Sequence, residues 1–101
     1  MVRNDLAVGL QHAQIAHAAI QVSLEFPSEV HDWFHDSNNI VVVAVPDEPA
    51  LKALAQSGPD CAVVVEPDLG NEVTAIGFCP SSDAQRACSH LPLAGKVSAY
   101  A

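Results

Sequence analysis

A histidine and a glutamine one helical turn apart are the first residues of this chain that could do chemistry. Gln14 and His17 are three positions apart in a segment with helical spacing, so a helix would make their side chains neighbours. An imidazole titrates near neutral pH, so His17 could act as a general base that activates water. The Gln14 amide could position a substrate ester or amide. The simpler alternatives are a core histidine bonded to backbone and a solvent-exposed glutamine.

Three carboxylates gather in one short polar loop, which contains Glu66, Asp68 and Glu72. A carboxylate of this loop could orient the second nitrogen of His17, and Glu66 or Asp68 could take part in acid/base catalysis. Asn71 and Glu72 could contact substrate. Alternatively, the three carboxylates could hold Mg²⁺ or Ca²⁺, or the loop could be a solvated turn in which Asp68 bonds its own backbone. We predict a functional loop without a metal or other cofactor.

Two further groups of potential ligands lack the spacing of a site. His31 and His35 would share one helix face, but the sequence places no third ligand beside them. We therefore interpret this helix face as solvated. The three cysteines lack C-x-x-C spacing. We therefore interpret them as structural thiols. Cys61 and Cys79 are each nine residues from Gly70. A turn centred there would place these two reduced thiols opposite each other.

The helix that carries Gln14 and His17 is predicted from about residue 9 to residue 25. One face holds Ala13, Ala16, His17, Ile20 and Leu24, and the other holds mainly Gln11, Gln14, Ala18, Gln21 and Glu25. Because apolar faces pack on sheets, we expect the imidazole of His17 on the sheet side and not in open solvent. Further helices are expected after Pro27, after Asp47 and after Ser81 or Ser82.

Runs of β-branched residues predict the strands. Residues 40–45 show no polar alternation, which is typical of a strand buried on both faces, so we expect this strand to be central. The strands at 61–65 and 72–79 flank the acidic loop and predict an antiparallel hairpin. Residues 1–3 resemble the end of a strand whose first half is missing. Residues 91–93 resemble an edge segment, since proline cannot donate to a central ladder.

These alternating elements predict a single α/β domain over residues 1–101. Strands buried on both faces require helices on both sides, so the expected architecture is a three-layer sandwich around a mixed four-stranded sheet. Residues 96–101 are expected to be a frayed tail. The first strand is too short to cover a sheet edge, and we therefore expect a homodimer.

Composition and charge narrow the functional classes. Half of the 101 residues are hydrophobic, which excludes a disordered chain, and no apolar run is long enough to span a membrane. Three cysteines and no visible secretory signal predict the cytoplasm. Twelve acidic residues against four basic ones give a formal charge of −8, without the basic patch that nucleic-acid binders use. We expect no membrane or DNA partner, and only weak binding of a tRNA-like substrate.

Two segments, QHAQIAHAAIQ at 11–21 and EPDLGNEVTAIGF at 66–78, carry a family resemblance, together with VRNDL before them and HLPLAG after them. The chain resembles the type-2 peptidyl-tRNA hydrolase family, and more closely a bacterial branch marked by EPDxGNExTAI. The resemblance implies a mixed four-stranded sheet with helices on both faces and a dimer. It also implies hydrolysis of the ester that joins a peptide to the 3′ end of tRNA.

The resemblance can be followed residue by residue. Gln14 and His17 stand at the glutamine and histidine of the family. The lysine of the family's G-K-G-K segment falls near Leu10, and its aspartate aligns with Glu66 or Asp68. The segment 70–72 replaces the family's R-T-Q. We therefore predict hydrolysis of an ester or amide on an aminoacyl- or peptidyl-tRNA-like substrate, with a catalytically degenerate ligand- or protein-binding module as the alternative.

Overall fold

A computed structural model describes residues 1–95 of the chain. Its elements, in order, are β1 (Val2–Arg3), α1 (Val8–Glu25), α2 (Pro27–His35), β2 (Ala44–Val45), α3 (Glu48–Ser57), β3 (Cys61–Glu66), the 3₁₀ turn η1 (Pro67–Leu69), β4 (Glu72–Phe78) and α4 (Ser82–Cys88). Asp47 and Ser81 cap α3 and α4, since their side-chain oxygens accept the backbone N–H of Ala50 and Ala84. The helices that follow Asp47 and Ser81 are therefore confirmed.

The four strands form one mixed sheet in the order β2-β1-β4-β3. β1 runs parallel to β2 and antiparallel to β4, and β3 with β4 forms the predicted antiparallel hairpin. Beyond β2, Val43 bridges Leu93, so the predicted edge segment at 91–93 lies at that edge. The mixed four-stranded sheet is confirmed.

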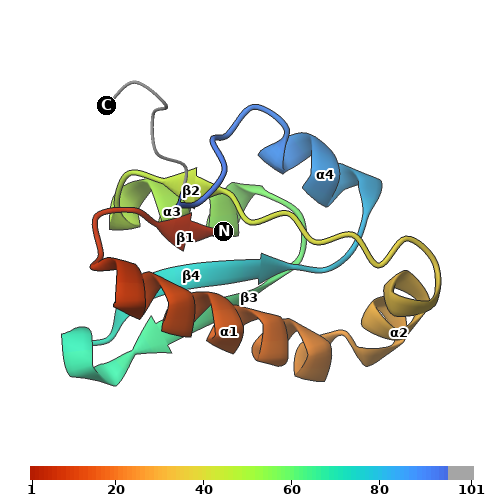
Figure 1. Cartoon of the computed structure of the whole chain (residues 1–101), viewed down its shortest axis with the longest axis horizontal. Coiled ribbons are helices and arrows are strands. Elements are labelled where there is room, and N and C mark those ends of the chain that lie inside the picture. The colour runs from red at the N-terminus through yellow and green to blue at the C-terminus, as the bar shows by residue number, and fades with distance from the viewer. Residues whose placement is uncertain (96–101) are drawn as a thin grey trace.

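Helices cover both faces of the sheet, as Figure 1 shows. On the α1 face the core consists of Val2, Ala18, Val64 and Ala75. On the α3 face it consists of Val45, Leu51, Val73 and Ile76. The three-layer α/β architecture is therefore confirmed, and α1 lies against β3 and β4.

The orientation of α1 differs from the prediction. The face predicted to be polar packs on the sheet, with Gln11, Gln14 and Ala18 buried, whereas His17 is exposed. Ile20 and Leu24 are 60% and 76% exposed. The prediction that the His17 stripe faces the sheet is therefore wrong.

Hydrogen bonds explain why the glutamine face packs inward. The Nε2 group of Gln11 donates to the carbonyl of Leu6 over 2.6 Å, and Nε2 of Gln21 donates to the carbonyl of Val63 over 2.7 Å. Glutamine side chains thus satisfy backbone acceptors that an apolar face would leave unpaired. At Gly77, a Cβ atom would lie 2.8 Å from the Ala18 carbonyl oxygen, so the helix and β4 approach closely there.

Residues 40–45 do not form a central strand. Ile40 and Val41 are 72% and 65% exposed, and only Ala44 and Val45 form β2, at one end of the strand order. The central strands are β1 and β4, because β1 pairs with β2 on one side and β4 on the other. The short first strand is thus internal, so the edge argument for a dimer is wrong.

A β-bulge in the hairpin changes the register of the cysteines. Val64 pairs with Ala75 and Val65 with Val73, which leaves Thr74 as the extra residue of β4. Cys61 consequently pairs with Phe78 and packs on the α3 face.

Cys79 lies elsewhere, with its thiol donating to the Glu29 carboxylate over 3.7 Å. The prediction of two facing thiols is therefore wrong.

The predicted tail at 96–101 lies outside the described residues. No helix within residues 1–95 is long and apolar enough to cross a membrane.

Candidate functional site

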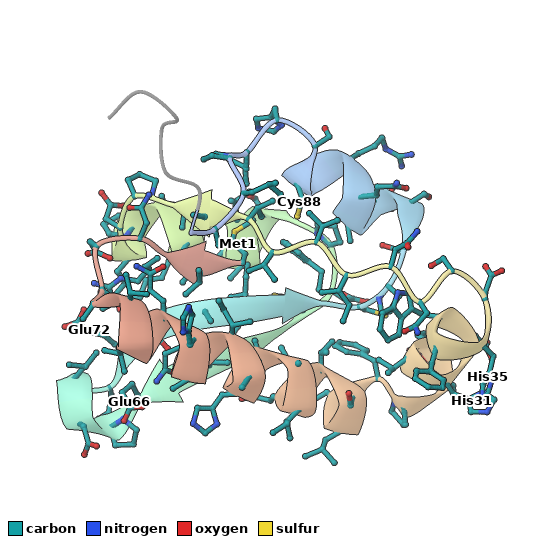
Figure 2. All side chains as sticks on the ribbon, viewed as in Figure 1. Met1, His31, His35, Glu66, Glu72 and Cys88 are labelled. Atoms are coloured by element: carbon teal, nitrogen blue, oxygen red, sulfur yellow. The ribbon has the colours of Figure 1, made fainter. Side chains whose placement is uncertain are left out.

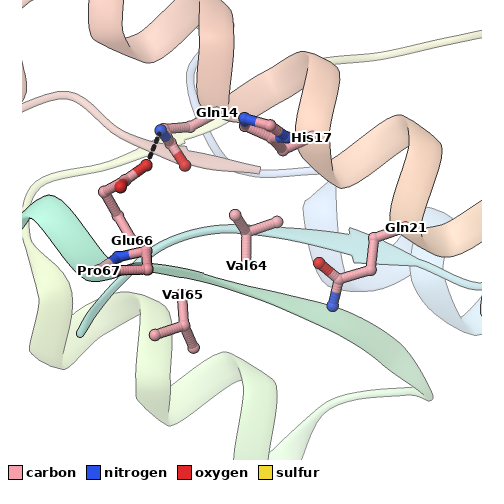
Figure 3. A pocket seen from close by; sticks show the side chains of 7 residues that line it. All are labelled: Gln14, His17, Gln21, Val64, Val65, Glu66 and Pro67. Atoms are coloured by element: carbon pink, nitrogen blue, oxygen red, sulfur yellow. Dashed lines mark hydrogen bonds between the residues drawn. The ribbon is translucent and has the colours of Figure 1, made fainter.

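A cleft of about 310 Å³ lies between α1 and the end of β3. The residues that line it are Gln14, His17, Gln21, Val64, Val65, Glu66 and Pro67. Figure 3 shows that α1 contributes the two amides and the imidazole, whereas β3 and the following turn contribute the carboxylate. The structure thus brings together three sequence-predicted site residues: Gln14, His17 and Glu66.

A buried chain of hydrogen bonds positions the Glu66 carboxylate. The hydroxyl of Thr74 donates to Oε1 of Gln14 over 2.7 Å, and Nε2 of Gln14 donates to Oε2 of Glu66 over 3.0 Å. Thr74 and Gln14 are almost fully buried. If the Gln14 amide were flipped, its oxygen would face the Glu66 carboxylate, and two hydrogen-bond acceptors would then meet without a donor. The two partners of Gln14 therefore fix the orientation of its amide.

Glu66 also closes the turn that follows β3. Its Oε1 atom accepts the backbone N–H of Asp68 over 3.1 Å. This backbone bond, the Gln14 amide and the charge of His17 lower the pKa of the Glu66 carboxyl. Glu66 is therefore ionised at neutral pH and serves the cleft as a hydrogen-bond acceptor.

His17 lies on α1 one turn after Gln14, with its side chain exposed at the cleft. No hydrogen bond joins His17 to Glu66, so the carboxylate does not orient the imidazole in the predicted way. The ring is open to water and to any ligand that enters the cleft. This position suits a base that must reach a bound water molecule.

The other predicted site residues lie outside the cleft lining. Asp68 is exposed in η1 and contributes its backbone N–H to Glu66. Asn71 adopts a positive φ of 63° in the exposed turn. The Glu72 carboxylate accepts from Nη1 of Arg3 over 2.7 Å. These residues shape the loop behind the cleft.

The basic residues in the described part of the chain are paired away from the cleft. Arg3 contacts Asp5 and Glu72, Lys52 contacts Glu48, and Arg86 contacts Asp83. The bonds from Asp5 and Glu72 raise the pKa of Arg3, which is 6% exposed. Among residues 1–95, no lysine or arginine lines the cleft, and His17 is the basic side chain that shares it with Glu66.

The acidic loop and the histidine pair do not converge into a metal site. The rings of His31 and His35 are 4.5 Å apart on α2, far along the molecule from Glu66 and Glu72 (Figure 2). Within residues 1–95, no group of three or more ligating side chains could hold a metal ion.

Comparison with known proteins identifies the family of this chain. The family model described as Peptidyl-tRNA hydrolase PTH2 matches residues 1–94. The chain belongs to this family. A search for curated relatives found no match. The chain is therefore a peptidyl-tRNA hydrolase-like protein with an α/β fold.

Sequence reasoning missed two polar residues of this PTH2 family member. Gln21 lines the cleft, and Thr74 holds Gln14 from behind. Both had a signal in the sequence. Gln21 follows Gln14 by seven residues, which is two helical turns on the same face. Thr74 is the threonine of the TAIG segment that carried the resemblance.

Proposed function

We propose that this chain hydrolyses the ester of an aminoacyl- or peptidyl-tRNA-like substrate in the cleft between α1 and β3. The observation that supports this most is the convergence of Gln14, His17 and Glu66 on one cleft in a chain that belongs to the PTH2 family.

His17 is the proposed general base. Its neutral imidazole takes a proton from water while the water oxygen attacks the ester carbonyl carbon. The tetrahedral intermediate then collapses, and the carbon to ribose-oxygen bond breaks. The imidazolium returns its proton to the leaving ribose oxygen. The products are a free carboxylic acid and a free 3′ hydroxyl.

Gln14 and Glu66 are proposed to hold the substrate next to His17. Because Glu66 is ionised, it accepts hydrogen bonds and is not the acid of the reaction. Asp68 acts through its backbone N–H, which fixes Glu66. Asn71 and Glu72 support the loop and do not contact the reacting ester.

We infer slow turnover. Within the part of the chain that the structure describes, no lysine or arginine lines the cleft to stabilise the negative oxygen of the tetrahedral intermediate. Removal of one such stabilising donor typically costs about 10²- to 10³-fold in rate. We therefore expect activity well below that of a family member with a lysine before the Q-x-x-H motif.

A hydrolysis assay on N-acetyl-aminoacyl-tRNA, run beside an active family member, tests the proposal. We expect slow release of the acyl group that His17→Ala abolishes. His12→Ala is the matched control, because His12 is exposed on the same helix but does not line the cleft. Hydrolysis that survives His17→Ala would contradict the role of His17 as the base. Undetectable hydrolysis by folded protein would contradict the proposed activity and favour a ligand- or protein-binding module.

We propose a homodimer that uses the outer face of α1, defined by Ile20 and Leu24. These side chains are exposed, and α1 carries no lysine or arginine and only Glu25 as an acid. In a chain of charge −8, two copies meet with least repulsion on an uncharged apolar surface.

Light scattering tests this association. We expect twice the mass of 10.6 kDa, and a monomer after the double substitution Ile20→Glu and Leu24→Glu. Val8→Glu is the control, since Val8 is 65% exposed in the first turn of the same helix. A wild-type monomer at micromolar and higher concentration would count against the dimer.

We also propose that residues 1–101 form one domain that acts in the cytoplasm without a DNA partner. Two core clusters on opposite faces of the same sheet support a single folding unit. A tRNA-like substrate and three free cysteines support the cytoplasm. The charge of −8 opposes binding to DNA.

A further inference from the structure

The side-chain oxygens that line the cleft between α1 and β3 differ in whether a protein donor already reaches them. Oε1 of Gln14 accepts from the Thr74 hydroxyl. Both oxygens of the Glu66 carboxylate accept a hydrogen bond, Oε2 from Gln14 and Oε1 from the backbone of Asp68. Oε1 of Gln21 has no donor within residues 1–95. It is therefore the side-chain acceptor of the cleft that the described chain leaves free.

The Gln21 amide is held in one orientation. Its Nε2 group donates to the backbone carbonyl of Val63 over 2.7 Å. A flipped amide would bring its oxygen against that carbonyl oxygen, and two acceptors would then meet. Figure 3 shows Oε1 of Gln21 turned toward the middle of the cleft, with Glu66 at the opposite end. No buried side-chain nitrogen or oxygen in the described residues lacks a partner, so this free oxygen is open to water or to a ligand.

Gln21 lies one helical turn after His17, which is the proposed base. Both side chains line the cleft from the same helix. Side chains four residues apart on a helix have their Cβ atoms about 5 to 6 Å apart. His17 and Gln21 are therefore spaced to contact neighbouring groups of one ligand.

An N-acyl-aminoacyl ester carries a hydrogen-bond donor close to its reacting carbon. The amide nitrogen is two bonds from the ester carbonyl carbon, at a distance of about 2.5 Å. An N–H···O bond extends this reach by about 2.9 Å. The two distances together match the spacing of one helical turn on α1. The ribose 2′ hydroxyl, which is the next donor, is four bonds from the same carbon.

We propose that Oε1 of Gln21 accepts the amide N–H of an N-acyl-aminoacyl ester while His17 activates the water that attacks the ester carbon. Gln21 is then a substrate-binding residue, and the proton transfers belong to His17. The amide N–H belongs to the backbone of the acyl group, so this contact requires no particular amino-acid side chain. The inference rests on the proposed function, because it uses the same cleft and the same reaction.

Binding of two non-hydrolysable ligands tests the inference. The first is adenosine joined through a 3′ amide to N-acetylalanine, and the second is adenosine joined in the same way to O-acetyllactic acid. The second ligand has an oxygen in place of the N–H and is otherwise of the same length and shape. We expect the N–H ligand to bind roughly 3- to 10-fold more tightly in NMR titrations, because one neutral hydrogen bond is lost in the other complex.

Two matched variants assign this preference to Gln21. Gln21→Met keeps an unbranched side chain and removes Oε1, so the two ligands should bind equally. The carbonyl of Val63 can then accept from water, since β3 is an end strand of the sheet. Gln11→Met is the control and should retain the preference. Gln11 also donates from α1 to a backbone carbonyl, that of Leu6, but it does not line the cleft.

The ratio of the two affinities separates substrate contact from a structural role. If Gln21 only held α1 on β3, Gln21→Met would weaken both ligands equally and leave their ratio unchanged. The inference would be overturned by equal affinity of the wild-type protein for the two ligands, by tighter binding of the O-acetyllactyl ligand or by no binding of either. A preference that survives Gln21→Met would also overturn it.

The binding experiment does not depend on turnover, because neither ligand is hydrolysed. If N-acetyl-aminoacyl-tRNA is hydrolysed through His17 and the two ligands bind equally, the proposed function stands and the contact with Gln21 is wrong. If the N–H ligand is preferred through Gln21 and no ester is hydrolysed, the contact stands and the proposed function fails.

Discussion

Thr74 and Gln14 form a buried pair in which the threonine hydroxyl donates to the amide oxygen over 2.7 Å. Their exposed fractions are 0% and 1%, so water cannot replace either partner. The pair connects the bulge of β4 to the cleft, because the other end of the Gln14 amide holds Glu66. An interior hydrogen bond thus determines where a surface carboxylate lies.

Thr74→Val should destabilise the fold. The substitution keeps the branched shape and leaves Oε1 of Gln14 buried without a donor, at a cost of about 1 to 3 kcal/mol. Urea denaturation measures the loss. Ser23→Ala is the control, since that exposed hydroxyl bonds only within α1, and its effect should stay within about 0.5 kcal/mol. Equal stability of Thr74→Val and wild type would contradict the role of the pair.

Two glycines should respond to alanine with opposite signs. Gly77→Ala places a Cβ atom 2.8 Å from the Ala18 carbonyl oxygen and pushes α1 away from β4, which should cost about 1 to 3 kcal/mol. Gly9→Ala meets no atom within 4 Å inside α1, where alanine is favoured, and should gain up to about 1 kcal/mol. Urea midpoints report both changes, and a Gly77→Ala protein as stable as wild type would show that α1 is not seated closely on β4.

The titration of Glu66 should depend on Gln14. The pKa of Glu66 lies below its ordinary value, so its ionised form contributes stability above that ordinary value, and this contribution is lost as pH falls through the lowered pKa. Gln14→Met removes the amide donor, and the pKa of Glu66 should rise. Carboxyl NMR titration measures this, with Gln85→Met on the exposed surface of α4 as control. A pKa that is unchanged by Gln14→Met would contradict the hydrogen-bond assignment.

The three thiols should react slowly at neutral pH. Burial raises the pKa of Cys61, Cys79 and Cys88, and the thiolate is the reactive form. The reaction rate with a chromogenic disulfide reagent should therefore be low near pH 7 and increase as pH rises beyond the ordinary thiol range. The urea-unfolded chain is the control and should react faster. Rapid formation of a Cys61–Cys79 disulfide under mild oxidation would contradict the register set by the bulge.

Binding of tRNA should be weak with a shallow salt dependence. The basic residues within 1–95 are already paired with acids, so at most about two phosphates can be neutralised, and the logarithm of the affinity should fall by less than about 2 per tenfold increase in salt. Filter binding at several salt concentrations measures this, beside an active family member. Nanomolar binding at about 150 mM salt would refute it.

Local patterns in the sequence were sufficient for most of the secondary structure. The cap residues Asp47 and Ser81 and the hairpin on either side of the acidic loop depend on neighbours within a few positions, and all of them appear as predicted. The approach of Gln14 and His17 to Glu66 came from the family resemblance, because no local rule relates residues as far apart in sequence as Gln14 and Glu66, which are 52 positions apart.

Only the tertiary structure decided which face of α1 is buried and where each strand lies. Hydropathy counts glutamine as polar and assigns it to solvent, yet Gln14 and Gln21 gain hydrogen bonds at the sheet that outweigh this preference. The apolar run at 40–45 could not reveal its position, since strand order depends on long-range pairing. The turn is centred on Leu69, between the paired Glu66 and Glu72, and not on Gly70; even with the bulge at Thr74, Cys61 pairs with Phe78, and Cys61 and Cys79 lie in different surroundings.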